Sequence, residues 1–166
     1  MSSKPPPRGP FHRENSDISI PGTATFALGR LADAPLQYTM FARGLAVKGL
    51  ASVGLRASNV LVTAVPGFGG LGPIPTLLTG MYAVAGIRQA YWAVFTANNY
   101  YSTSASLGIV FCNTAINIVN TLAAVHVLIS TPNSNLGSFT DFIGWKQWAG
   151  LTIFAIGIAM ETIAKK

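Results

Sequence analysis

Two long stretches of this chain contain no charged side chain, and they limit what the chain can fold into. Between Arg88 and Asp141 lie 52 residues without Asp, Glu, Lys or Arg, and another 31 lie between Arg56 and Arg88. Only 10% of all residues are charged, against about 25% in soluble domains. A soluble fold would have too few polar side chains to cover such stretches. The sequence therefore predicts an all-α membrane protein.

Four apolar segments are long enough to cross a bilayer as helices, which requires about 20 residues each. They cover residues 44–64, 77–95, 105–129 and 143–163. Residues 66–75 are rich in Gly and Pro and predict a loop between the first two segments. Four crossings place both termini on one side of the membrane. The basic N-terminal residues and the terminal Lys165 and Lys166 then satisfy the positive-inside rule.

The segment 44–64 has two open interpretations, because it carries Lys48 and Arg56. In the first, it crosses the membrane, with Lys48 extending to the interface and Arg56 paired inside the protein. In the second, it lies along the membrane surface as a basic amphipathic helix. We favour the crossing, and place a transmembrane helical domain over residues 37–166.

Residues 1–36 predict an extended polar N-terminal arm. They combine Pro, Ser and Gly with charges of both signs. A segment of this composition does not bury enough apolar surface to fold alone in water. We expect a partner surface to order it.

Asn113, Asn117 and Asn120 recur at the spacing of one helix face within the segment 105–129. Unpaired amides are costly in hydrocarbon, so this face must meet protein or water. Two uses remain open. The favoured one is hydrogen bonding between helices, worth about 0.6–2 kcal/mol per contact. The other is the wall of a polar channel or ligand groove.

Arg88 lies inside an apolar segment beside Tyr91 and Trp92, where its charge needs an anion, carbonyl groups or an aromatic face. Glu161 is the only acid in the four predicted spans. Arg88 therefore meets Glu161, a lipid phosphate or an acid on another chain, and we favour the last two. Together with Arg56 and the three asparagines, these two residues are the candidate contacts to lipid or partner subunits.

No arrangement of residues in the sequence indicates catalysis, a bound cofactor or a metal. A Ser–His–Asp group, paired carboxylates, a metal-spaced His cluster and a phosphate loop cannot be assembled. His126 has no acid within its own span, so we interpret it as structural. The basic residues are scattered and form no nucleic-acid-binding motif. Neither nucleic acid nor a soluble small-molecule substrate is an expected partner.

The stretch from Gly80 to Trp92, continuing through Asn98, Asn99 and Tyr100 to His126, resembles the fungal accessory membrane subunits of mitochondrial respiratory complex I, the NADH:ubiquinone oxidoreductase. The resemblance implies a multi-pass, non-catalytic subunit of the mitochondrial inner membrane that stabilises the complex or helps to assemble it. Its partners would be other membrane subunits and phospholipid. Quinone, iron–sulfur and flavin chemistry would belong to other chains.

The same stretch also resembles small membrane enzymes of the steroid-reductase and membrane glutathione-transferase type, which place an Arg near the end of a helix. The sequence lacks their recurring His, Asn and acid signatures. A stand-alone integral membrane enzyme is therefore the alternative function. A small carrier or channel forms a third class, and it requires the asparagine face to line water.

Overall fold

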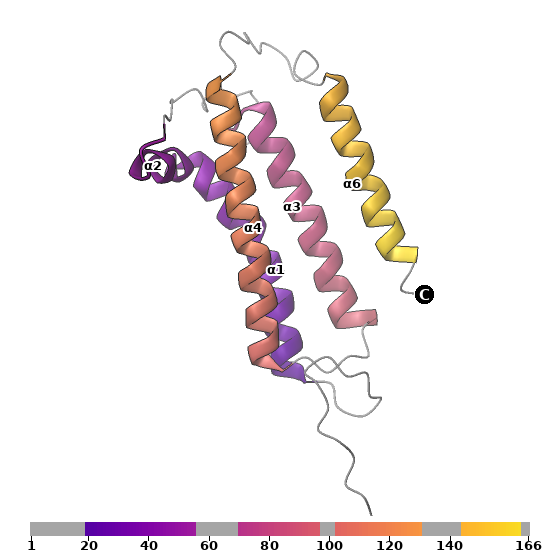
Figure 1. The fold of residues 1–166 in the computed structure, drawn as a ribbon. Coiled ribbons are helices and arrows are strands. Elements are labelled where there is room, and N and C mark those ends of the chain that lie inside the picture. The colour runs from indigo at the N-terminus through magenta and orange to yellow at the C-terminus, as the bar shows by residue number, and fades with distance from the viewer. Residues whose placement is uncertain (1–18, 56–69, 97–101, 131–143, 164–166) are drawn as a thin grey trace, which may run out of the picture. The chain divides into compact units, whose positions relative to one another are not determined.

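The computed structural model describes residues 19–55, 70–96, 102–130 and 144–163. These residues form helices and no strand, which confirms the all-α prediction (Figure 1). The elements in chain order are α1 (Ile20–Ala42), α2 (Leu45–Ser52), α3 (Pro73–Tyr91), the π-helix η1 (Trp92–Thr96), α4 (Thr103–Ser130) and α6 (Trp145–Ile163).

Helix α1 occupies a segment for which the sequence predicted an extended arm. The side chain of Ser19 caps its start, because the backbone N–H of Gly22 donates to Ser19 Oγ at 3.2 Å. Pro21 lies in the first turn, where a backbone N–H would have no acceptor within the helix, so proline breaks no hydrogen bond there. The helix also continues through Pro35. The arm prediction is therefore wrong for residues 20–36. Residues 1–18 lie outside the described residues.

The predicted crossing over residues 44–64 is not a continuous helix. Gly44, at φ 64°, separates α1 from α2, and the chain turns again at Gly54, at φ 75°. Glycine adopts such positive φ values without steric strain. Between these turns α2 has eight residues, about 12 Å of helix, which is too short to cross about 30 Å of hydrocarbon. Residues 56–64 lie outside the described residues.

Helices occupy the three later segments that the sequence predicted as spans, although their boundaries differ by up to four residues. Helix α3 begins at Pro73, so the predicted loop over residues 66–75 extends too far. Proline is well suited to the first turn of a helix because its φ is already helical. Among the described residues, α4 alone is long and apolar enough to cross a membrane by itself, over the 24 residues Thr103–His126. Residues 97–101 and 131–143 are not among those described.

The chain divides into two compact units. Unit 1 comprises Met1–Thr39 and Thr79–Thr121, and unit 2 comprises Met40–Leu78 and Leu122–Lys166. Helices α1, α3 and α4 each contribute residues to both units.

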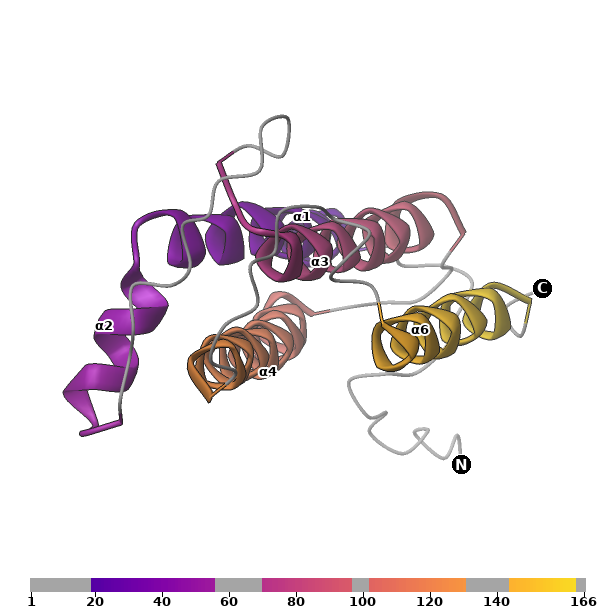
Figure 2. The same cartoon turned by 90° about the horizontal axis from the view of Figure 1, so that it is seen from above.

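In unit 1, α1 approaches both α3 and α4 closely, as Figure 2 shows from above. A Cβ added at Gly86 on α3 would lie 2.5 Å from the backbone oxygen of Arg30 on α1. A Cβ added at Gly29 on α1 would lie 2.6 Å from both γ-methyl groups of Val110 on α4. Both approaches require the absence of a side chain, and small residues have this role at many helix interfaces in membranes.

Unit 2 contains an apolar core that brings together α2 and parts of α1 and α4. Its buried members are Phe41, Ala46, Leu50, Leu71 and Val125, and Met40, Val47, Leu78 and Leu122 pack against them. Helix α6 also belongs to unit 2, but none of its residues is buried. The two units therefore differ in what their interiors contain.

Candidate functional site, a buried polar network

Three polar side chains on one face of α1 are buried in unit 1. Arg30, Asp33 and Gln37 are spaced by three and four residues, which places them along one side of a helix. Their exposed fractions are 3%, 2% and 0%. A buried charged residue is rare unless it is paired, so these three side chains must have hydrogen-bond or ion-pair partners nearby.

Asp33 is the centre of the network. Its Oδ2 accepts a hydrogen bond from Arg30 Nη1 at 3.3 Å, within a buried ion pair, and another from Asn117 Nδ2 on α4. Its Oδ1 accepts from Gln37 Nε2 at 3.1 Å. The carboxylate is thus opposed by one positive charge and two amide donors. Such additional hydrogen bonds are what a buried ion pair requires to persist in a low dielectric.

The network continues from α1 to both neighbouring helices. Arg30 Nε donates to Gln89 Oε1 on α3 at 2.6 Å. Thr121 Oγ1 on α4 donates to Gln37 Oε1 at 2.8 Å. Tyr82 on α3 completes the connection, because its hydroxyl donates to the backbone oxygen of Asn117 at 3.4 Å. Three helices are thus joined by polar contacts between residues distant in sequence.

The cost of an unpaired buried charge indicates how much the network contributes to the packing of α1. An Arg or an Asp at the centre of an isolated helix costs about 2.5–3.5 kcal/mol in membrane insertion. Removal of one member of a buried ion pair destabilises a protein by about 3–5 kcal/mol, because the remaining charge is left uncompensated. The contacts with Gln89 and Asn117 add hydrogen bonds to this ion pair and link it to α3 and α4.

The three asparagines that the sequence grouped together do not act together. Asn117 belongs to the network and bonds to another helix, which confirms the interhelical hydrogen-bond interpretation at this residue. Asn113 Nδ2 instead donates to the backbone oxygen of Ile109 on its own helix, at 2.8 Å. Asn120 is exposed. The helical spacing was correct, but only one of the three side chains points into the interior of unit 1.

The structure describes two of the three charged candidates. Arg88 is partly exposed near the end of α3, in unit 1. Glu161 is partly exposed on α6, in unit 2. Arg56 lies outside the described residues. Glu161 is also not the only acid within a long helix, because Asp33 lies in α1.

Sequence reasoning missed Arg30, Asp33 and Gln37, although a signal was present. These residues share the helical spacing that singled out the asparagines. The Gly and Pro residues around them predicted an extended segment, and in an extended segment residues three and four apart do not share one face. Gln89 and Thr121 had no signal of their own, because only the packing of α3 and α4 against α1 gives them a buried partner.

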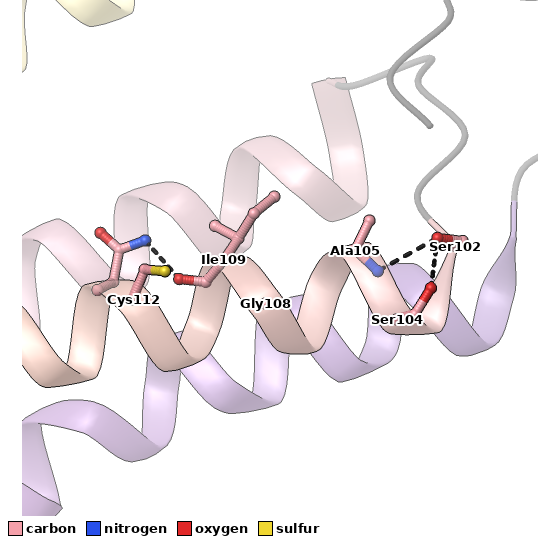
Figure 3. A pocket seen from close by; sticks show the side chains of 7 residues that line it. Ser102, Ser104, Ala105, Gly108, Ile109 and Cys112 are labelled. Carbon is pink, nitrogen blue, oxygen red and sulfur yellow. Dashed lines mark hydrogen bonds between the residues drawn. The ribbon is translucent and has the colours of Figure 1, made fainter. Parts of the chain in front are cut away.

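A second feature is an open hollow of about 540 Å³ along the N-terminal part of α4 (Figure 3). Its lining consists of Ser102, Ser104, Ala105, Gly108, Ile109, Cys112 and Asn113. Ser102 Oγ accepts from the backbone N–H of Ala105 at 3.2 Å and lies 3.1 Å from Ser104 Oγ. These bonds serve α4 itself, and the free thiol of Cys112 is exposed. Within the described part of the chain, no group of His, Cys, Asp or Glu is arranged to hold a metal ion.

Comparisons of this chain with protein-family models, with curated proteins and with solved structures found no match.

Proposed function

We propose that this chain is an integral membrane protein in which α1, α3, α4 and α6 cross the bilayer. The observation that carries the proposal is an inverted distribution of side chains. Arg30, Asp33 and Gln37 are buried, whereas large apolar side chains are exposed on all four helices. Examples are Leu28 and Leu31 on α1, Ile87 and Phe95 on α3 and η1, Phe111 and Val119 on α4, and Ile153 and Met160 on α6. Hydrocarbon is the solvent that suits such a surface.

The lengths of these helices support four crossings. With 23 residues in α1, 28 in α4 and 19 in each of α3 and α6, they extend about 28–42 Å, against about 30 Å of hydrocarbon. Helix α1 takes the place of the segment 44–64 as the first crossing, so the number of crossings remains even. At the start of α6, Lys146 Nζ lies 5.9 Å from the centre of the Trp145 ring, a pairing typical of the membrane interface.

The role we propose is that of a non-catalytic accessory subunit that stabilises or helps to assemble mitochondrial complex I in the inner membrane. The resemblance of residues 80–126 to accessory subunits of that complex supports it. Helix α6 supports it as well, because its residues from Trp148 to Met160 are apolar except for Thr152 and none of them is buried, and such a surface requires lipid or protein neighbours. Other membrane subunits and phospholipid are the partners that suit this surface.

Exposed apolar surface, and not unpaired charge, is the feature of this chain that calls for partners. The sequence predicted Arg56, Arg88, Glu161 and the three asparagines as contacts to lipid or partner subunits. The structure pairs Arg30, Asp33 and Asn117 within the chain. These groups need no outside partner, so they no longer support a subunit role.

Native gel electrophoresis of gently solubilised mitochondrial membranes tests this proposal. The chain is expected to migrate with assembled complex I, and deletion of its gene is expected to reduce the amount of assembled complex without removal of a cofactor. Re-expression of the unaltered chain is the control and restores the complex. Migration of the chain only as a small species, with complex I unchanged in the deletion strain, would refute the subunit role.

A stand-alone membrane enzyme is a second candidate, because ionisable residues within membrane helices often mark functional sites. The Arg30–Asp33 pair is such a feature. The substitutions Asp33→Asn, Arg88→Ala and His126→Ala separate the two functions. Selective loss of turnover in a folded variant would favour the enzyme. Loss of migration with a large complex would favour the subunit.

A further inference from the structure

Helix α1 combines an apolar outer face with two charged side chains, which makes it a poor membrane segment by itself. Leu28, Leu31 and Leu36 are exposed, whereas Arg30 and Asp33 are buried within unit 1. Helix α4 has no charged residue over Thr103–His126 and is apolar enough to cross alone. Helix α4 is therefore apolar enough to cross a bilayer alone, whereas α1 requires partners for its two charges.

The side chains that hydrogen-bond the charges of α1 come from later parts of the chain. Gln89, which accepts from Arg30, lies 59 residues downstream of it. Asn117, which donates to Asp33, lies 84 residues downstream. Hydrocarbon offers neither acceptors nor donors, so lipid does not replace these two side chains.

Close backbone approach gives the network a defined place to form. Gly86 allows α3 to approach the backbone oxygen of Arg30, and Gly29 allows α1 to approach Val110 on α4. Both glycine contacts lie in the same unit as the network. The surfaces of α3 and α4 thus provide both the shape and the hydrogen-bonding groups that α1 requires.

We propose that α1 enters the membrane only after α3 and α4, and that Gln89 and Asn117 hold it there through Arg30 and Asp33. The first helix of the chain is then the last of the three to cross. This inference rests on the proposed membrane location. It adds an order of assembly that the location alone does not imply.

A cysteine reporter in the full-length chain tests whether the crossing of α1 depends on these groups of α3 and α4. In a Cys112→Ser background, Leu31→Cys places one thiol beside Arg30 at an exposed position on α1. A thiol in hydrocarbon does not ionise and does not react with a water-soluble maleimide. We expect the reporter to be protected in opened membranes that carry the otherwise unaltered chain. We expect Asn117→Leu to increase its labelling about threefold to tenfold, as the loss of one interhelical hydrogen bond would.

Two controls use the same reporter and the same helix. Asn120→Leu is the matched control, because Asn120 is exposed and lies outside the network, and it should leave labelling unchanged. In a separate chain that retains Cys112 as its only thiol, Asn117→Leu should leave Cys112 protected, since α4 becomes more apolar. Labelling of Cys112 in that chain would show that the whole domain is lost and would overturn the inference.

A triple variant distinguishes the loss of this contact from a general failure of Asn117→Leu to fold. Arg30→Leu and Asp33→Leu remove the charges that need Asn117, so their combination with Asn117→Leu should restore protection of the reporter. The inference is overturned if Asn117→Leu alone leaves the reporter protected, or if the triple variant stays labelled. Release of the unaltered chain by an alkaline wash would instead overturn the membrane location itself.

Discussion

The two units of this protein hold their helices together in opposite ways. Unit 1 uses a polar network around Asp33 and close backbone contacts at Gly29 and Gly86. Unit 2 uses an apolar core around Phe41 and Val125. In a bilayer, apolar burial between helices gains little, because lipid is as apolar as the helix surface. Unit 1 therefore shows the means of helix association that remain effective in a membrane.

The difference has consequences for specificity. Hydrogen bonds are directional, so the contacts of Asp33 with Asn117, of Arg30 with Gln89 and of Gln37 with Thr121 fit one register of α1 against its neighbours. An apolar core accepts substitutions that conserve its volume. Unit 1 should therefore respond strongly to the loss of single polar groups. Unit 2 should respond mainly to changes in side-chain volume.

The largest effect is expected from Asp33→Leu. The substitution leaves Arg30 buried and uncompensated, so we expect a loss of about 3–5 kcal/mol in the free energy of unfolding. Titration with a denaturing detergent, followed by tryptophan fluorescence, measures it. The double variant Arg30→Leu/Asp33→Leu is the control and should recover most of the loss. A double variant as unstable as the single one would show that the charge is not the cause.

Leu50→Ala tests unit 2 and should have the next largest effect. Leu50 is a buried member of the apolar core, and its truncation leaves a cavity, with an expected loss of about 2–4 kcal/mol. Leu50→Met is the matched control, because it nearly conserves volume and should cost below about 1.5 kcal/mol. Tryptophan probes separate the units, since Trp92 lies in unit 1 and Trp145 in unit 2. Equal changes in the fluorescence transitions of Trp92 and Trp145 would contradict the view that Leu50 stabilises unit 2 in particular.

Gly86→Ala tests the close approach of α3 to α1. A Cβ at this position would lie 2.5 Å from the Arg30 backbone oxygen, which should cost about 1–3 kcal/mol because backbone must shift. Gly80→Ala, on the same helix, meets no atom within 4 Å and should stabilise the protein by up to about 1 kcal/mol. Thermal unfolding in detergent measures both. Equal changes in the two variants would argue against close packing at Gly86.

The smallest effect is expected from Thr121→Val. The variant keeps the shape of the side chain but removes the donor to Gln37, with an expected loss of about 0.5–1.5 kcal/mol. Thr152→Val on α6 is the control, since Thr152 donates only to the backbone oxygen of Trp148 on its own helix. Chemical unfolding of both variants under identical conditions gives the difference. An effect of Thr152→Val as large as that of Thr121→Val would remove the support for an interhelical bond.

Parts of this structure were accessible from the sequence and others were not. Long apolar segments with few charges predicted the helices near residues 77–95, 105–129 and 143–163, because a long apolar run has few alternatives to a buried or membrane helix. The same reasoning failed for α1. Arg30, Asp33 and Pro35 lower its apolar character, so composition predicted an extended polar arm over this segment.

The sequence by itself determined the helical class and the presence of extensive apolar surface, since both follow from local composition and periodicity. Only the tertiary structure decided that α1 is a helix with a polar interior face, and that Asn117 rather than Asn120 is used. The physical reason is that a buried charge is stable only when hydrogen-bonding groups surround it, and here some of these groups lie on other helices. The partners of Arg30 and Asp33 are separated from them by 59 and 84 residues.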